Sequence, residues 1–160
     1  MWILDRIVVG IALAGVFIRL GNLMNSEIVG IPTDAPWAFS FPHFWNDELK
    51  QYDATPRHAA QLYEAILYLV SFATLMFLFW KKKMYEKRGV IFGAFLVLVF
   101  GARFLVEFVK LGQTDRDDVL AINTGQILSI PLVLMGIYFL WKGLKSVRST
   151  DNVEHLQAAE

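Results

Sequence analysis

Two arginines of this 160-residue sequence lie beside or within apolar segments, where a charge is costly. Arg19 and Asn22 follow the apolar run 7–18, and Arg103 follows the apolar stretch 89–102, which is long enough to span a membrane only if it includes Arg103 and Glu107. A guanidinium group can hold a phosphate through two parallel hydrogen bonds, and amide groups add further donors. These residue types therefore predict a site for an anion such as a phosphate.

Further polar side chains recur at helical spacing. Arg103 and Glu107 are four residues apart, which places them on one helix face. They form either part of the anion site or an ion pair that merely lets this helix enter a membrane. A second polar stripe is formed by Arg57, Gln61 and Glu64, at i, i+4 and i+7, with His58 beside it. The histidine either caps the helix or transfers protons, for which its usual pKa near neutrality is suited.

The segment "NTGQILSIP" (123–131) opens the last apolar stretch. Asn123 or Thr124 can cap a helix there. Gln126 serves either this helix start or a polar ligand. The sequence has no cysteine and its three histidines are scattered, so we predict no metal site.

Four apolar stretches must position these residues: 7–18, 65–80, 89–102 and 119–141. Hydrophobic residues make up 56% of the sequence, against about 45–50% in ordinary soluble domains. A soluble helical bundle is disfavoured because the stretches offer little polar face to water. The sequence predicts an all-α, polytopic membrane protein with about four transmembrane helices.

The basic residues predict an orientation. The connection 81–88 carries five Lys/Arg residues, so the positive-inside rule places it and the C-terminus in the cytoplasm. Four spans then put both ends inside, and the segments 20–58 and 110–122 outside. The costly polar groups all fall toward the outer leaflet, where such groups usually face the bundle interior. They predict one polar site.

The outer loop 20–58 is long and rich in aromatic residues. Trp37, Phe39 and Phe41 alternate along "PWAFSFPHFW" (36–45), which predicts a short strand. This segment is either an aromatic belt at the membrane interface or an arm that contacts a substrate. We expect residues 1–148 to form the membrane-embedded domain and 149–160 a polar, disordered tail. Zero net charge gives no reason to expect nucleic acid as a partner.

Four sequence segments resemble those of one enzyme family in the same order. They are "RLGNLMNSEIVG" (19–30), "RHAAQLYEA" (57–65), "GARFLVEFVK" (101–110) and "GQILSIP" (125–131). The chain is similar, over about residues 6–142, to the C-terminal half of prolipoprotein diacylglyceryl transferases. These bacterial plasma (inner) membrane enzymes transfer a diacylglyceryl group from phosphatidylglycerol to the lipobox cysteine in the signal peptide of a prolipoprotein. They need no metal and no cofactor.

The resemblance implies roles for individual residues. Arg19 and Arg103 would contact the phosphate of phosphatidylglycerol and stabilise the leaving group, and Glu107 would support Arg103. The catalytic candidates are Arg19, Arg103, Glu107 and His58. The substrate-binding candidates are Arg19, Asn22, Asn25, Glu27, Gln61, Arg103 and Gln126.

The chain also departs from the family pattern. Ala59 and Ala60 replace the Pro-Ser that commonly follows the histidine, and Val99 stands where a tyrosine is often found. The N-terminal half of the family, with its His-Gly-Gly-type motif, has no counterpart here. We therefore expect the chain to act with a missing N-terminal half and to be inactive alone. The alternatives are a non-catalytic membrane module that binds anionic lipid or a signal peptide, and a small channel or transporter subunit.

Overall fold

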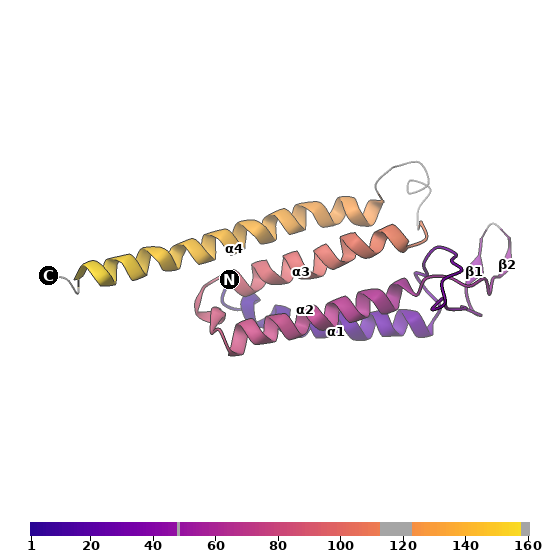
Figure 1. The fold of residues 1–160 in the computed structure, drawn as a ribbon, viewed down its shortest axis with the longest axis horizontal. Coiled ribbons are helices and arrows are strands. Elements are labelled where there is room, and N and C mark those ends of the chain that lie inside the picture. Colours follow the sequence, from indigo (N-terminus) through magenta and orange to yellow (C-terminus); the bar gives the residue numbers. More distant parts are fainter. Residues whose placement is uncertain (48, 113–122, 158–160) are drawn as a thin grey trace.

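The computed structural model describes the backbone of residues 1–47, 49–112 and 123–157, and side chains within these ranges as far as residue 145. Four long helices run alongside one another (Figure 1). They are α1 (Leu4–Met24), α2 (Ala60–Trp80), α3 (Val90–Val106) and α4 (Thr124–Gln157). Short 3₁₀ turns are η1 (Met84–Glu86) and η2 (Glu107–Val109), and a strand pair is formed by β1 (Trp45–Asn46) and β2 (Gln51–Tyr52).

Each long helix contains a segment that can cross a membrane. These segments are Leu4–Met24, Ala60–Trp80, Val90–Val109 and Thr124–Lys145, with lengths of 20 to 22 residues. About 20 predominantly apolar residues are needed to span the hydrocarbon core of a bilayer. The predicted all-α membrane architecture is confirmed. The predicted start of the fourth span, residues 119–122, lies outside the described residues.

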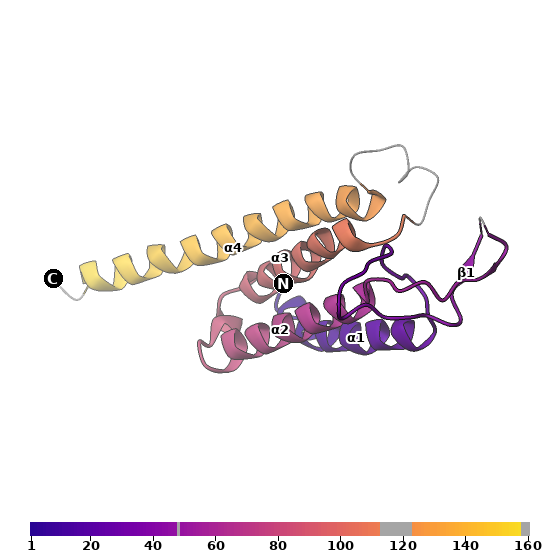
Figure 2. The ribbon, with the colours of Figure 1, turned by 45° about the vertical axis from the view of Figure 1, so that its right-hand side comes forward.

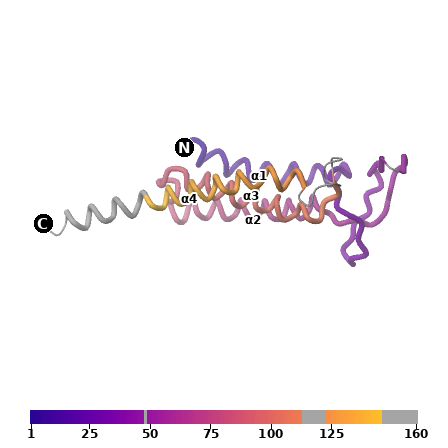
Figure 3. The backbone as a smooth tube through the Cα atoms, turned by 90° about the horizontal axis from the view of Figure 1, so that it is seen from above, coloured from indigo at the N-terminus to yellow at the C-terminus, as the bar shows by residue number. Residues whose placement is uncertain are grey.

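Helix α3 lies between α4 on one side and the pair of α1 and α2 on the other (Figures 2 and 3). Two glycines let α3 and α4 approach closely. A Cβ atom at Gly93 would lie 2.7 Å from the carbonyl oxygen of Gly136, and one at Gly136 would lie 2.8 Å from the carbonyl oxygen of Gly93. In a membrane, where helices gain little from hydrophobic burial, such close backbone contact is a main source of helix association.

The bundle has two different ends. We call the end where α2 stops and α3 begins the turn end, and the opposite one, which carries residues 25–59, the loop end. At the turn end the buried carboxylate of Asp5 accepts hydrogen bonds from the backbone N–H groups of Gly89 (2.7 Å) and Phe92 (2.9 Å). The first N–H groups of a helix lack partners within it, so Asp5 of α1 caps α3.

At the loop end, extended segments cross over the helix termini. Gly30 donates its N–H to the carbonyl oxygen of His58, and Ile31 donates to that of Val109, both at 3.0 Å. Residues 29–31 therefore lie between the segment before α2 and the segment after α3. A Cβ atom at Gly30 would clash with the backbone of His58 and lie 2.7 Å from the Val109 carbonyl oxygen, so this crossing requires glycine.

The predicted strand at 37–41 is wrong in its extent. Within it, Phe39 forms an isolated bridge to Arg57, whereas the regular antiparallel pair joins β1 and β2 with Trp45 opposite Tyr52. Phe41 is buried against Val29 and Ala59, so it packs under the loop and does not continue a strand. At the other terminus, α4 continues to Gln157, and the predicted domain boundary at residue 148 stays a prediction.

Candidate functional site

A buried carboxylate lies at the centre of the loop end. Glu64, in the second turn of α2, is fully buried. Its Oε2 atom lies 2.9 Å from Nε of Arg19, near the end of α1, and its Oε1 atom lies 3.1 Å from Nζ of Lys110, which follows η2. Three segments distant in sequence therefore meet at one side chain.

Lys110 also lies 3.3 Å from Oε2 of Glu107, which completes an ionic cluster of Arg19, Glu64, Glu107 and Lys110. Each of the four side chains is at most 10% exposed. Buried charges are tolerated when they are paired, because desolvation alone costs several kcal/mol per ion. Gly125 of α4 leaves room for the Glu107 carboxylate, since a Cβ atom there would lie 2.5 Å from it.

Of the two alternatives for Arg103 and Glu107, the ion pair does not occur in the described structure. The backbone N–H of Glu107 still donates to the carbonyl oxygen of Arg103, but the Glu107 side chain pairs with Lys110. Arg103 is half-buried and makes no ion pair or hydrogen bond with any residue in the described parts of the chain.

Tyr68 relates the two arginines in space. It lies one turn after Glu64 on α2 and is buried, with its ring centroid 5.9 Å from the guanidinium carbon of Arg19. It interacts electrostatically with Glu64, Arg19 and Arg103. Arg19 therefore lies beside this tyrosine, and Arg103 is near enough to contribute to its electrostatic environment.

The segment after Arg19 turns sharply. Ser26 and Ile28 both have positive φ values, 57° and 56°, a conformation that is rare for a β-branched residue. The turn brings the backbone carbonyl oxygen of Glu27 within 2.6 Å of Nε2 of Gln61, which donates a hydrogen bond to it. Asn22 is half-buried at the end of α1, whereas the side chain of Glu27 is exposed.

Gln61 is fully buried, and its Oε1 atom has no hydrogen-bond partner in the described structure. Asn25 is exposed like Glu27. These three predicted substrate-binding residues therefore differ in exposure. Gln61 is buried beneath the turn, whereas Asn25 and Glu27 lie on its surface. Within the described ranges, Glu27 forms no ion pair with a residue of the ionic cluster, and Asn25 is uncharged.

His58 is tied to the loop. Its Nδ1 atom lies 3.1 Å from the hydroxyl oxygen of Tyr63, and its backbone N–H donates to the carbonyl oxygen of Ile31 at 3.0 Å. Among the residues that the structure describes, no hydrogen bond or ion pair joins His58 to the ionic cluster. Its predicted catalytic role stays a prediction.

Gln126 and Asn123 join the start of α4 to the end of α3. The backbone N–H of Asn123 donates to Oε1 of Gln126 at 3.2 Å, as in a capping box. The side-chain amide of Asn123 donates to the carbonyl oxygen of Glu107 at 3.3 Å, and that of Gln126 to Phe104 at 3.5 Å. The side chain of Gln126 therefore stabilises the start of α4, and its predicted role in substrate binding stays a prediction.

Arg57 anchors the outer loop. It is buried and pairs with Asp53, with Nη2 2.6 Å from Oδ2, and its guanidinium carbon lies 4.6 Å from the ring centroid of Phe44. Hydrogen bonds from Thr55, and then from Arg57, hold the pKa of Asp53 below its usual range. This second ion pair holds the loop that covers the ionic cluster.

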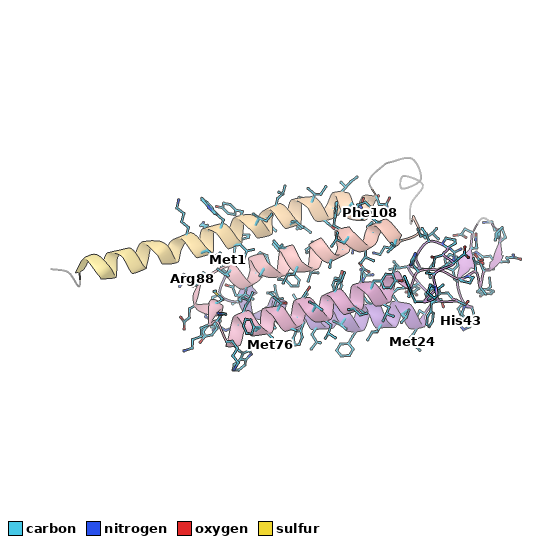
Figure 4. All side chains as sticks on the ribbon, in the orientation of Figure 1. Met1, Met24, His43, Met76, Arg88 and Phe108 are labelled. Atoms are coloured by element: carbon cyan, nitrogen blue, oxygen red, sulfur yellow. The ribbon has the colours of Figure 1, made fainter. Side chains whose placement is uncertain are left out.

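An apolar groove of about 570 Å³ lies between α2, α3 and α4, and Arg103 is not among the residues that line it. Gly101, Ala102, Phe104 and Leu105, on either side of Arg103 in sequence, all line it. In Figure 4, Met24 and Phe108 lie at the loop end, and Met76 and Arg88 lie toward the turn end. The site thus combines buried charges at the loop end with an apolar surface on the same helices.

A sequence model of prolipoprotein diacylglyceryl transferases matches residues 1–142. The chain belongs to this family. One relative, from Chloroherpeton thalassium, is 44% identical over 147 residues, which are 92% of this chain and 52% of the relative. Another, from Bacteroides fragilis, is 47% identical over 143 residues, which are 88% of this chain and 48% of the relative. Both are named phosphatidylglycerol–prolipoprotein diacylglyceryl transferase.

A third relative with that name, from Porphyromonas gingivalis, is 38% identical over 156 residues, 91% of this chain and 54% of the relative. The chain spans about half the length of these curated relatives. The comparison with solved structures found no match. Family membership and four apolar helices together indicate a multi-pass protein of the bacterial inner membrane.

Sequence reasoning missed the part that Lys110 plays in this family member. The sequence places Lys110 in the outer connection 110–122, yet its side chain is 5% exposed and binds two carboxylates. Lys110 follows Glu107 by three residues, a spacing at which oppositely charged side chains on a helix can pair, so the contact with Glu107 could have been predicted. Glu64 was recognised as part of a polar stripe, but nothing in the sequence marked it as the residue that joins Arg19 to Lys110.

Proposed function

We propose that this chain supplies the phosphate-binding half of a phosphatidylglycerol–prolipoprotein diacylglyceryl transferase. The observation that carries the proposal is the charge arrangement at the loop end. The two bases and two acids of the ionic cluster cancel, and Arg103 adds a positive charge that has no ion-pair partner in the described structure. A half-buried arginine in a membrane protein favours an anionic ligand at this position.

The geometry of Arg19 supports the same conclusion. Nε of Arg19 lies 2.9 Å from Glu64, and the guanidinium group also carries the terminal nitrogens Nη1 and Nη2. Those two nitrogens can donate parallel hydrogen bonds to phosphate oxygens. The largely apolar groove between α2, α3 and α4 offers a surface to an acyl chain of the lipid.

In the proposed reaction, the sulfur of the lipobox cysteine attacks the glyceryl carbon that carries the phosphate. A carbon–sulfur bond forms, the carbon–oxygen bond to the phosphate breaks with its electron pair, and glycerol-1-phosphate leaves. The thiol proton passes to a general base, for which His58 is the candidate on this chain. Arg19 and Arg103 stabilise the negative charge on the leaving phosphate, because they are held in place before it develops.

The partners of the site follow from this role. They are phosphatidylglycerol, the signal peptide of a prolipoprotein with its lipobox cysteine, and a missing N-terminal half of the enzyme. No metal or other cofactor enters the proposed reaction. We expect the chain alone to bind phosphatidylglycerol and to transfer nothing, because no described base contacts the ionic cluster and Asn25 and Glu27 are exposed. The competing proposal is a non-catalytic module that binds anionic lipid or a signal peptide.

Co-expression tests the proposal against this alternative. The chain and the N-terminal half of a close relative are produced together in a strain depleted of its own transferase. We expect the mass of a lipobox substrate to increase by a diacylglyceryl group only when both halves are present. The exposed Arg88→Lys variant is the matched control for Arg19→Lys and Arg103→Lys. Absence of product with both halves intact favours the non-catalytic module, and product from the chain alone refutes the two-half account.

The proposed orientation places both ends in the cytoplasm and the loop end toward the outer leaflet. It is tested with single cysteines in place of Asp47, in the loop, and Lys82, in the connection between α2 and α3. A membrane-impermeant thiol reagent should label position 47 in intact cells and position 82 only after permeabilisation. Labelling of both positions from the same side would contradict the topology.

A further inference from the structure

We propose that Lys110 is a positioning residue that keeps Arg19 available for the lipid phosphate. Lys110 occupies Oε1 of Glu64, so that this carboxylate does not hold the Arg19 guanidinium with both of its oxygens. The inference rests on the proposed function, because the anion in question is the phosphate of phosphatidylglycerol.

The two cations use different oxygens of the same carboxylate. Nζ of Lys110 lies 3.1 Å from Oε1 of Glu64, and Nε of Arg19 lies 2.9 Å from Oε2. A carboxylate has two oxygens and can accept a bidentate arginine with both. Because Glu64 is fully buried, an oxygen without a cation would be strongly driven to find one.

Without Lys110, the nearest donor for Oε1 is the same arginine. Glu64 could then accept hydrogen bonds from Nε and the adjacent terminal nitrogen of Arg19 together. That side-on pairing removes one of the two nitrogens that a phosphate needs. It also leaves the buried cluster with one more negative than positive charge, which opposes an anionic ligand.

The position of Lys110 is set by the fold. Its backbone bridges to Gly30, and Leu111 donates its N–H to the carbonyl oxygen of Val29 at 3.1 Å. Glu107 provides a second contact for the ammonium group, 3.3 Å away. The segment 29–31, which continues directly from the turn after Arg19, therefore also fixes the lysine that controls Arg19.

The test uses the whole 160-residue chain in phosphatidylcholine nanodiscs, titrated with phosphatidylglycerol. We expect Lys110→Met to weaken phosphatidylglycerol binding about tenfold to hundredfold, the effect of one hydrogen bond to a charged group. Lys110→Arg should restore binding, since arginine keeps a cation beside Oε1. Lys82→Met, in the exposed connection, is the matched control for the loss of a lysine.

The deciding variant combines Lys110→Met with Glu64→Gln. A glutamine at position 64 no longer competes as a carboxylate for Arg19, and the remaining charges of the cluster, on Arg19 and Glu107, cancel, although Glu107 loses its contact with Lys110. We expect this double variant to fold and to bind phosphatidylglycerol nearly as well as the original chain. If it binds as weakly as Lys110→Met, or if Lys110→Met binds normally, the positioning role is refuted.

The failure of this inference can be separated from a failure of the proposed function. If the original chain does not prefer phosphatidylglycerol and Arg19→Lys changes nothing, the phosphate site itself is wrong. If the preference exists and depends on Arg19, but the double variant does not recover, then Lys110 acts in another way, such as direct contact with the phosphate.

Discussion

The two ends of the bundle bury carboxylates in different ways. At the turn end, Asp5 accepts two hydrogen bonds from backbone N–H groups of α3 and forms no ion pair among the described residues. At the loop end, Glu64 is held by two cationic side chains from different segments. Backbone donors fix a carboxylate without adding any group that could bind a ligand. Side-chain cations have further donors of their own, and we infer that the buried carboxylate of the loop end, unlike Asp5, belongs to a site that can hold an anion.

The largest effect should come from the two arginines at the loop end. In a complete enzyme, Arg19→Lys and Arg103→Lys should each lower the rate of diacylglyceryl transfer about 10²–10³-fold, the usual effect of losing one charged contact to a developing anion. Lysine keeps the charge but loses the bidentate fork. Rates are measured by the mass shift of a lipobox substrate. Normal rates in both variants would mean that the arginines only anchor the helices.

A substitution at the turn end should lower the stability of the protein without changing its affinity for phosphatidylglycerol. Asp5→Ala leaves the N–H groups of Gly89 and Phe92 without their acceptor, and we expect a loss of about 2–4 kcal/mol in the free energy of unfolding. The measurement is unfolding in mixed micelles with increasing sodium dodecyl sulfate, with Glu86→Ala as the exposed control. Phosphatidylglycerol affinity of the folded protein should stay unchanged. Reduced affinity in folded Asp5→Ala would contradict the division between the two ends.

A smaller effect is expected from Gly125, which lies against Glu107. The Cβ atom of Gly125→Ala would occupy the position of the Glu107 carboxylate, which must turn away and leave Lys110 with Glu64 alone. We expect phosphatidylglycerol affinity to fall about two- to fivefold, the value of a weak ion pair. Gly10→Ala is the control, because a Cβ atom there meets nothing within 4 Å. Equal affinities for the two variants would mean that Glu107 does not influence the site.

The smallest effect concerns the outer loop. The pKa of Asp53 is lower in the folded loop than in an unfolded chain, where it is near 4. Its contribution to loop stability is therefore complete above about pH 4 and is lost as the pH falls through the folded-state pKa. Pepsin cleavage in residues 36–56 should accelerate over this range. In Asp53→Asn the cleavage rate should depend less on pH. If the pH dependence is unchanged in this variant, it arises from another titratable group.

The sequence was sufficient for the membrane helices because apolarity over about 20 residues is a local property. It was also sufficient to single out Arg19 and Arg103, since charges are costly in such segments. It was insufficient for Glu107, because both Arg103 and Lys110 lie at helical spacing from it and the sequence does not say which of them it pairs with. The burial of Lys110 likewise depends on residues 29–31 crossing the end of the bundle, a long-range contact with no local signal.

The measurement that tests the central claim most directly is ³¹P NMR of the 160-residue chain in nanodiscs that contain both phosphatidylglycerol and phosphatidylcholine. We predict that the chain shifts or broadens the phosphatidylglycerol resonance selectively. Arg19→Lys and Arg103→Lys should each reduce this effect, whereas Arg88→Lys at the turn end should not. Equal perturbation of both lipids, or a selective effect that persists without Arg19 and Arg103, would contradict a phosphate site at the loop end.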